Sequence, residues 1–161
     1  MITSIWIKPG EDASAAHAIR EEVFQKELGF TAEEDRDLMD NYAFQLVLKY
    51  NDIPVATGRI TYGSVGTAKL ERICVLKKYR CQGIGDGLVK VLDYKASQMG
   101  MQYSQVETTI EKERFYNRIG YKATGETKDK YGRSLIIMKK ECNDGTVENC
   151  AHQRACQKGQ G

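Results

Sequence analysis

The stretch RCQGIGDG at residues 80–87 is the most informative part of this sequence. It follows an apolar run, LERICVL at residues 70–76, and it opens a helical pattern that continues to about residue 99. Glycines let backbone amides approach an anion closely, and a helix start adds unpaired N–H donors with a partial positive charge. Basic side chains gather at the same corner, from Lys77, Lys78 and Arg80. A strand, a basic glycine turn and a helix in this order indicate a phosphate-binding site.

The residues that this motif lacks narrow the choice of phosphate ligand. A P-loop needs Gly-Lys-Ser/Thr at the helix start, whereas Gly85 is followed here by Asp86 and Gly87. The dinucleotide fingerprint G-x-G-x-x-G does not fit the spacing of the three glycines. The pattern that fits is R-x-x-G-x-G.

Two further segments give this short pattern its specificity. RFYNRIGY at residues 114–121 follows about thirty residues later, and ERICVLKKYR at residues 71–80 leads into the turn. With these pieces in this order and spacing, the chain resembles the GNAT superfamily of acetyl-CoA-dependent N-acetyltransferases. The similarity is concentrated between residues 70 and 121 and extends more faintly over the N-terminal half.

The resemblance implies where acetyl-CoA binds. The strand would bulge and turn its backbone toward the pantetheine arm, which then pairs like an added strand; the residues are Ile73, Cys74 and Val75. The turn would bind the pyrophosphate through its backbone amides, with charge added by the Arg80 side chain and the helix start; its residues are Cys81, Gln82, Gly83, Ile84, Gly85 and Asp86. The alternative is a glycine turn that merely joins a strand to a helix.

Two residues, Cys81 and Thr109, depart from the family pattern, and a third, Cys74, could suggest a different mechanism. Cys81 stands where the family most often has glycine, so the turn is either right-handed there or slightly strained. Thr109 stands where many relatives carry Asn, Gln or His to bind the pantetheine arm, and a hydroxyl has a shorter reach. Cys74 invites an acyl-cysteine mechanism, but a buried thiol in an apolar strand is usually inert.

Two residues are candidates for the proton transfers. The phenol of Tyr116 is protonated at neutral pH, and the resemblance places it beside the sulfur of the coenzyme, as a general acid for the departing thiolate. Glu71 is the candidate base, acting through a water. The competing interpretations are a tyrosine that packs on the closing hairpin and a surface glutamate on a half-exposed strand.

Composition places the chain among globular proteins. Its 161 residues fit one domain, and 41% hydrophobic with 29% charged residues is ordinary. A net charge of +2 gives no reason to expect nucleic-acid or membrane binding. No apolar run is long enough to span a bilayer, the N-terminus does not read as a signal peptide, and the five cysteines form no C-x-x-C pair. We therefore expect a cytoplasmic protein with reduced thiols, and a homodimer remains open.

The order of elements predicts an α+β fold. Strand, helix, three strands, helix, strand, helix and a closing hairpin give a mixed, mostly antiparallel sheet of six to seven strands flanked by helices. The domain is expected to cover residues 1–142. The polar tail 143–161 is expected to be flexible and dispensable, because it has too few apolar side chains to offset the entropy of ordering.

Three other features have competing interpretations. The tail region holds Cys142, Cys150, His152 and Cys156, but without the close spacing of a zinc site, so no metal is expected. His17 is expected to be a packed or surface residue. The acidic segment 33–40 falls where the family builds its acceptor wall; it would suit a cationic amine, and a solvated charged loop is an equal alternative.

The sequence thus predicts an acyltransferase that moves an acetyl group from acetyl-CoA to a primary amine by direct attack in a ternary complex. The alternative is a non-catalytic module with the same fold that binds an acyl-CoA or a partner. The acceptor is not identified by the sequence: small-molecule amines, polyamines and protein amines all remain open, because acceptor specificity lies in loops that vary freely on one fold.

Overall fold

A computed structural model describes residues 1–142, and its elements follow the order expected from the sequence. The strands are β1 (Ile2–Ile7), β2 (Phe44–Tyr50), β3 (Ile53–Tyr62), β4 (Thr67–Val75), β5 (Tyr103–Thr108), β6 (Lys122–Lys130) and β7 (Arg133–Glu141). The α-helices are α1 (Ser14–Arg20), α2 (Ala32–Asp35), α3 (Ile84–Gln98) and α4 (Glu113–Arg118). A π-helical stretch η1 (Glu21–Glu27) prolongs α1, and 3-10 turns occur at η2 (Leu38–Asn41), η3 (Lys77–Tyr79) and η4 (Ile110–Lys112).

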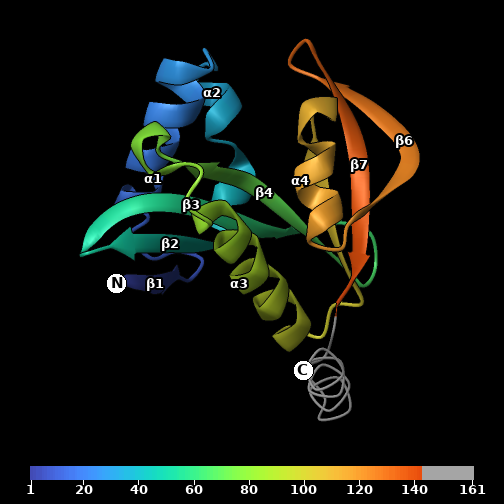
Figure 1. Ribbon diagram of the computed structural model, residues 1–161, viewed down its shortest axis with the longest axis horizontal. Helices are drawn as coiled ribbons and strands as arrows, with labels where there is room; N and C mark the ends of the chain where they lie inside the picture. Colours follow the sequence, from blue (N-terminus) through green and yellow to red (C-terminus); the bar gives the residue numbers. More distant parts are fainter. Residues whose placement is uncertain (143–161) are drawn as a thin grey trace, which may run out of the picture.

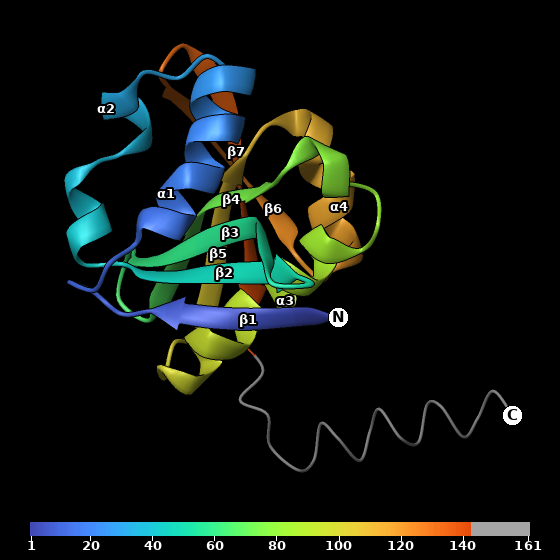
Figure 2. The same ribbon diagram turned by 90° about the vertical axis from the view of Figure 1, so that its left-hand side faces the viewer.

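The strands form one sheet of seven in the order β1-β2-β3-β4-β5-β7-β6. Every neighbouring pair is antiparallel except β4 and β5, which are parallel. Figure 2 shows β1, β2, β3 and β4 stacked in this order. In Figure 1, β6 and β7 lie on the opposite side of β4 from β1, β2 and β3. The predicted α+β fold, with a mixed and mostly antiparallel sheet, is therefore confirmed.

The sheet is covered on both faces, because alternate strand residues point to opposite sides. In β2, Leu46 and Leu48 join a core with Leu88 and Leu92 of α3, whereas Val47 joins a second core with Ile19 of α1. Gly58 in β3 lies directly under α3, where an added Cβ would meet Leu92 Cδ1 at 2.7 Å. The two helices thereby pack against β3 and β4 from opposite faces of the sheet.

The structure refines several boundaries. The spacing of apolar residues predicts one helix from residue 12 or 14 to about 28, and in the structure this helix changes from α- to π-helical at Glu21. The sequence of residues 31–41 is compatible with one short helix, whereas the structure has two: Thr31 caps α2 and Asp37 caps η2 through their side chains. The last hairpin is longer than expected, because Tyr131 and Gly132 turn it within two residues at φ of 52° and 73°.

No helix within residues 1–142 is long and apolar enough to cross a membrane. The expectations for a flexible tail, and for Cys150, His152 and Cys156, concern positions outside the described residues.

Candidate active site

The sheet opens at its centre, between β4 and β5. These two strands pair over three residues only, from Thr67 opposite Tyr103 to Lys69 opposite Gln105. Beyond that point β4 stays paired with β3, and β5 stays paired with β7. The two halves of the sheet therefore diverge as a wedge, and the edge of β4 that faces β5 is left without a strand partner from residue 70 onward.

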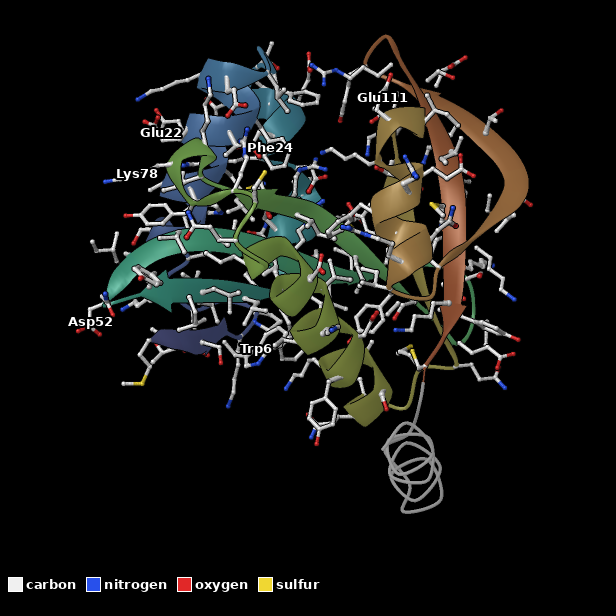
Figure 3. All side chains as sticks on the ribbon, in the orientation of Figure 1. Trp6, Glu22, Phe24, Asp52, Lys78 and Glu111 are labelled. Carbon is white, nitrogen blue, oxygen red and sulfur yellow. The ribbon has the colours of Figure 1, made fainter. Side chains whose placement is uncertain are left out.

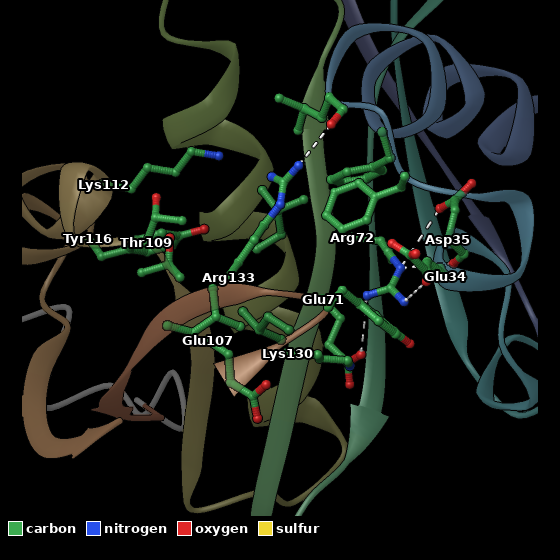
Figure 4. A pocket seen from close by; sticks show the side chains of 18 residues that line it. Glu34, Asp35, Glu71, Arg72, Glu107, Thr109, Lys112, Tyr116, Lys130 and Arg133 are labelled. Atoms are coloured by element: carbon green, nitrogen blue, oxygen red, sulfur yellow. Dashed lines mark hydrogen bonds and ion pairs between the residues drawn. The ribbon is translucent and has the colours of Figure 1, made fainter. Parts of the chain in front are cut away.

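A cavity of about 160 Å³ lies in this wedge. Both arms line it: β4 contributes Glu71, Arg72 and Ile73, and the β5 arm contributes Thr109 and Tyr116. Figure 4 shows Tyr116, Thr109 and Lys112 on one side and Arg72, Glu34 and Asp35 on the other. In Figure 3, Glu22 and Lys78 project outward from the molecule, whereas Phe24, which also lines the cavity, points inward.

The bulge expected in β4 is present. The pairing of β3 with β4 shifts between Thr57 and Arg59, so that Arg72 and Ile73 together oppose Gly58. Arg72 has a φ of 53°, a left-handed conformation that is costly for a residue with a Cβ. Its guanidinium donates to the carbonyl oxygens of Asp35 and Glu34, each at 2.9 Å. The bulge is thus tied to α2, and it turns Ile73 into the cavity.

Cys74 points away from the cavity. Its side chain is buried in the core beneath α1, with Ile19 and Val47. Burial raises the pKa of the Cys74 thiol to about 12, which removes the thiolate needed for an acyl-cysteine. Only the backbone of Cys74 is available to a ligand in the wedge.

The glycine turn after β4 has the backbone shape that an anion site requires. Cys81 and Gly83 both have left-handed φ, 61° and 80°. Of the two alternatives for Cys81, a right-handed turn or a slightly strained one, the structure has the strained one. α3 begins at Ile84. The amide of Gly87 donates to the carbonyl oxygen of Gly83, which precedes the helix, at 3.1 Å. The amides before Gly87 are the unpaired donors of a helix start.

The side chains of this turn point away from that set of amides. Gln82 donates to Lys78 O at 3.4 Å, Ile84 is buried in the core, and Asp86 lies 3.9 Å from Arg118. A Cβ on Gly85 would approach the ring of Phe115 to 3.6 Å. A phosphate would therefore be bound by the backbone rather than by these side chains.

Arg80 makes structural contacts that the sequence did not predict. Its Nε donates to Val75 O at 2.9 Å, and its two terminal nitrogens bind the carboxylate of Glu27 at 2.7 Å each. The side chain ties the end of β4 to the end of η1, and Glu27 neutralises much of its charge. The predicted contact of Arg80 with the pyrophosphate stays a prediction.

Tyr116 lies on α4 and is packed from both sides by aromatic rings. The centroids of Phe115 and Tyr121 are 4.9 Å and 5.6 Å from its own, both in edge-on geometry. Burial raises the pKa of the Tyr116 phenol, and the nearby carboxylate of Asp93 raises it further. The phenol is therefore protonated at neutral pH, as general acid catalysis requires.

Glu71 reaches the cavity from β4 and is held at both oxygens. Arg59 donates to Oε2 at 2.8 Å, and the hydroxyl of Thr61 donates to Oε1. Burial alone would raise the pKa of Glu71, but the charge and hydrogen bond of Arg59 outweigh it and hold the pKa below its ordinary value. Glu71 is thus a fixed, ionised carboxylate.

Three aspartates of the acidic segment are paired with arginines rather than solvated. Asp35 and Asp40 bind Arg20 at 2.9 and 2.7 Å, and Asp37 binds Arg59 at 2.7 Å. Both arginines are fully buried. A buried cation is costly unless it is paired and hydrogen-bonded, so these aspartates neutralise the interior.

Sequence reasoning did not identify Arg20 and Arg59. A signal existed for Arg59: it stands in the middle of the otherwise apolar strand IPVATGRITY, residues 53–62, in a chain with an acidic run upstream. The segment still lines the cavity, but through Glu34 and Asp35.

Comparisons with known proteins agree with this geometry. Residues 10–142 match the family model described as an acetyltransferase (GNAT) domain. The uncharacterized N-acetyltransferase YjcF of Bacillus subtilis is 35% identical over 119 residues, which cover 74% of this chain and 84% of that protein.

Solved structures share the fold. A candidate N-acetyltransferase from Lactobacillus plantarum superposes with a TM-score of 0.81 at 28% identity, covering 88% of this chain and 99% of that one. An acetyltransferase of Elizabethkingia anophelis, solved with acetyl-CoA bound, has a TM-score of 0.65 at 19% identity and covers 87% of this chain and 97% of its own.

Proposed function

The chain belongs to the GNAT family of acetyltransferases, and on this premise we propose that it transfers the acetyl group of acetyl-CoA directly to a primary amine. The family uses acetyl-CoA, and the chain is an acyltransferase. The observation that carries the proposal is the cavity in the wedge, where an unpaired strand edge, an ionised carboxylate and a protonated phenol meet.

The fit of acetyl-CoA to the chain rests on two features of the backbone. The edge of β4 beyond Lys69 has free hydrogen-bonding groups on the side of β5, where an extended pantetheine arm can pair as an added strand. The left-handed turn at Cys81 and Gly83 presents the first amides of α3 to an anion. Thr109, at the end of β5, faces the same cavity and can bond to the arm through its hydroxyl.

The proton transfers are assigned to the two arms of the wedge. Glu71 accepts the proton of the acceptor ammonium through a water, since Arg59 and Thr61 already occupy its oxygens. The neutral amine then forms its N–C bond with the thioester carbonyl, and the C–S bond of the resulting tetrahedral intermediate breaks. Tyr116 donates its proton to the departing thiolate. The amide nitrogen gives up its remaining proton through solvent, which reprotonates the Tyr116 phenolate, so both products are neutral at the reacting atoms.

Direct attack is favoured over an acyl-enzyme by the position of the cysteines. Cys74 lies in the core beneath α1 with its thiol protonated, and Cys81 lies on the exposed turn rather than in the cavity. No cysteine of residues 1–142 lines the cavity.

Release of CoA, measured over a panel of primary amines, tests the proposal. Amine-dependent release, with a mass increase of one acetyl group on the amine, is the expected result. Preincubation with acetyl-CoA followed by removal of free ligand should leave no acetylated protein. Binding of acetyl-CoA without turnover of any amine would instead support the non-catalytic module.

A further inference from the structure

The mouth of the wedge is spanned by four residues from its two arms. Arg133 donates to Leu28 O at 2.8 Å, and its guanidinium stacks 4.2 Å from the centroid of the Phe30 ring. The Phe30 ring in turn meets Tyr131 edge-on at 6.3 Å. Leu28 and Phe30 follow η1 on the β4 arm, whereas Tyr131 and Arg133 lie at the tip of the β6–β7 hairpin. These four residues, here called the roof, all line the cavity.

The volume of the cavity favours a small acceptor. The whole cavity that the roof borders measures about 160 Å³, comparable to cavities that hold a benzene-sized molecule, and in the proposed function the coenzyme shares this space. A lysine on a folded protein would have to extend its side chain past Arg133 and Tyr131 with the protein surface against the roof. A small free molecule needs no such displacement, and the side chains of Phe24, Leu28 and Phe30 offer it an apolar surface.

The charges that line the cavity are unequally compensated. Asp35, Glu71 and Glu107 each have a basic partner that is not itself part of the cavity lining, at 2.9, 2.8 and 3.2 Å. Arg72 is paired with Asp37 at 3.3 Å. Within residues 1–142, the lining side chains without an oppositely charged group within 4.0 Å are Lys112, Lys130, Arg133 and Glu34. Three cations and one carboxylate leave the cavity with a surplus of positive charge.

Lys130 is the cation in this surplus that is best placed to bind a ligand. It is half-buried on the cavity wall, and its Nζ lies 5.4 Å from the centroid of the Tyr131 ring. Burial lowers the pKa of Lys130, as does the charge of Arg72, while Glu71 and Glu107 oppose this effect. A half-buried ammonium without a counter-ion is stabilised when an anionic ligand supplies one.

We propose that the acceptor is a small amino acid with an apolar side chain, whose carboxylate pairs with Lys130 beneath the roof. Its ammonium lies toward Glu71 and its side chain against Phe24, Leu28 and Phe30. This inference rests on the proposed function, and it excludes cationic polyamines and protein lysines as the preferred substrates.

Matched pairs of acceptors test the role of the carboxylate. Phenylalanine is compared with phenethylamine, and leucine with isoamylamine, at equal concentrations of the neutral amine so that the different amine pKa values cancel. The expected kcat/KM favours the amino acid by roughly tenfold to a hundredfold, the range of a charge-assisted hydrogen bond. In Lys130→Met this ratio should fall toward one, and in Lys130→Arg it should be largely retained. The ratio is internal to each variant, so a partly unfolded preparation does not alter it.

Lys122→Met is the control, because Lys122 is exposed on β6 and does not line the cavity. Its ratio should equal that of the wild type. Three results would overturn the amino acid acceptor. They are equal kcat/KM for both members of each pair in the wild type, an unchanged ratio in Lys130→Met, and acetylation of a lysine peptide or of spermidine that is faster than that of phenylalanine and leucine. Absence of turnover with every amine, although acetyl-CoA binds, would contradict the proposed function itself.

Discussion

Tyr116 illustrates how much of a catalytic assignment depends on packing. Its phenol is buried among Phe115, Tyr121 and the apolar side of α3, which keeps the proton on the oxygen. The same rings fix the orientation of its side chain. Loss of the hydroxyl therefore removes a proton donor without removing the packing of the ring.

Tyr116→Phe should lower kcat by about 10²–10⁴-fold, the usual contribution of a general acid. The KM for acetyl-CoA should change little, and the melting temperature should stay close to that of the wild type. Steady-state CoA release and a thermal unfolding curve measure these quantities. Turnover equal to that of the wild type would mean that solvent protonates the thiolate and that Tyr116 is only a wall of the cavity.

The pKa of Glu71 is lowered, whereas that of Tyr116 is raised. Because Arg59 lowers its pKa, the carboxylate is ionised throughout the neutral range and does not titrate there. The rise of kcat/KM with pH should then follow the pKa of the amine substrate rather than that of Glu71. Glu71→Gln should lower kcat/KM by about 10²-fold, at the lower end of general base effects, and leave the pH of half-maximal rate unchanged. If the pH profile of kcat/KM has an acidic limb near neutral pH that vanishes in Glu71→Gln, the pKa of Glu71 is raised instead.

The bulge in β4 is the element that connects the two proposed substrate sites. It directs Ile73 into the wedge, and the guanidinium of Arg72 fastens it to the backbone of α2. The conformation of Arg72 is left-handed, at φ of 53°. A residue that lacks a Cβ adopts this conformation without strain.

Two variants that both lose the guanidinium separate the bulge from its anchor. Arg72→Gly should be more stable than Arg72→Ala by about 1 kcal/mol, the cost of a left-handed conformation for a residue with a Cβ. Both should be less stable than the wild type, because the carbonyls of Glu34 and Asp35 lose their donor. Urea unfolding of the three proteins gives the comparison. An alanine variant as stable as the glycine variant would be incompatible with a left-handed residue at this position.

The elements themselves were largely accessible from the sequence, because each carries a local signal. The alternation of apolar and polar residues predicts the strand that the structure has at Ile2–Ile7, and the pair Asn51 and Asp52 predicts the first hairpin turn, where both residues have positive φ. The glycine turn and the helix after it followed from short-range spacing. The bulge in β4 was expected only through the resemblance to GNAT proteins.

The long-range contacts were not accessible. That Arg80 binds Glu27 depends on how the end of η1 packs against the turn, and that Arg133 binds Leu28 O depends on the twist of the last hairpin. The ion pairs of the acidic segment were not predicted for a related reason: its partners, Arg20 and Arg59, come from α1 and β3. Charge along a sequence indicates a surplus but not the partner that neutralises it.

At the scale of the whole molecule, a buried network of charges holds α1, α2, β3 and β4 together. Arg59 lies at its centre and binds Asp37, Asp40 and Glu71 at 2.7–2.8 Å. Burial alone would raise the pKa of Asp37, but Arg59 and Arg72 lower it from 3.8 to about 2. The pKa values of Asp40 and Glu71 are also lowered.

This network makes stability depend on pH in a defined direction. A carboxyl group with a lowered folded-state pKa stabilises the protein above its unfolded pKa, and the contribution is lost as pH falls through the folded value. The urea midpoint should therefore change little down to about pH 5 and fall between about pH 4 and pH 2. Asp37→Asn should have a lower midpoint at neutral pH and a shallower acid dependence. The same acid dependence in wild type and variant would remove Asp37 from the explanation.

The proposed function depends on the binding of acetyl-CoA across the wedge, with its pyrophosphate on the glycine turn. This binding is tested by the calorimetric affinity for CoA in Gly83→Val, because Gly83 has a φ of 80° and a β-branched residue disrupts that conformation. Gly125→Val is the matched control: its φ is 87°, an added Cβ there meets nothing within 4 Å, and it lies on β6, outside the wedge. CoA binding should weaken strongly in Gly83→Val and stay at the wild-type value in Gly125→Val. Equal affinities in the two variants would contradict the assignment of the cofactor site.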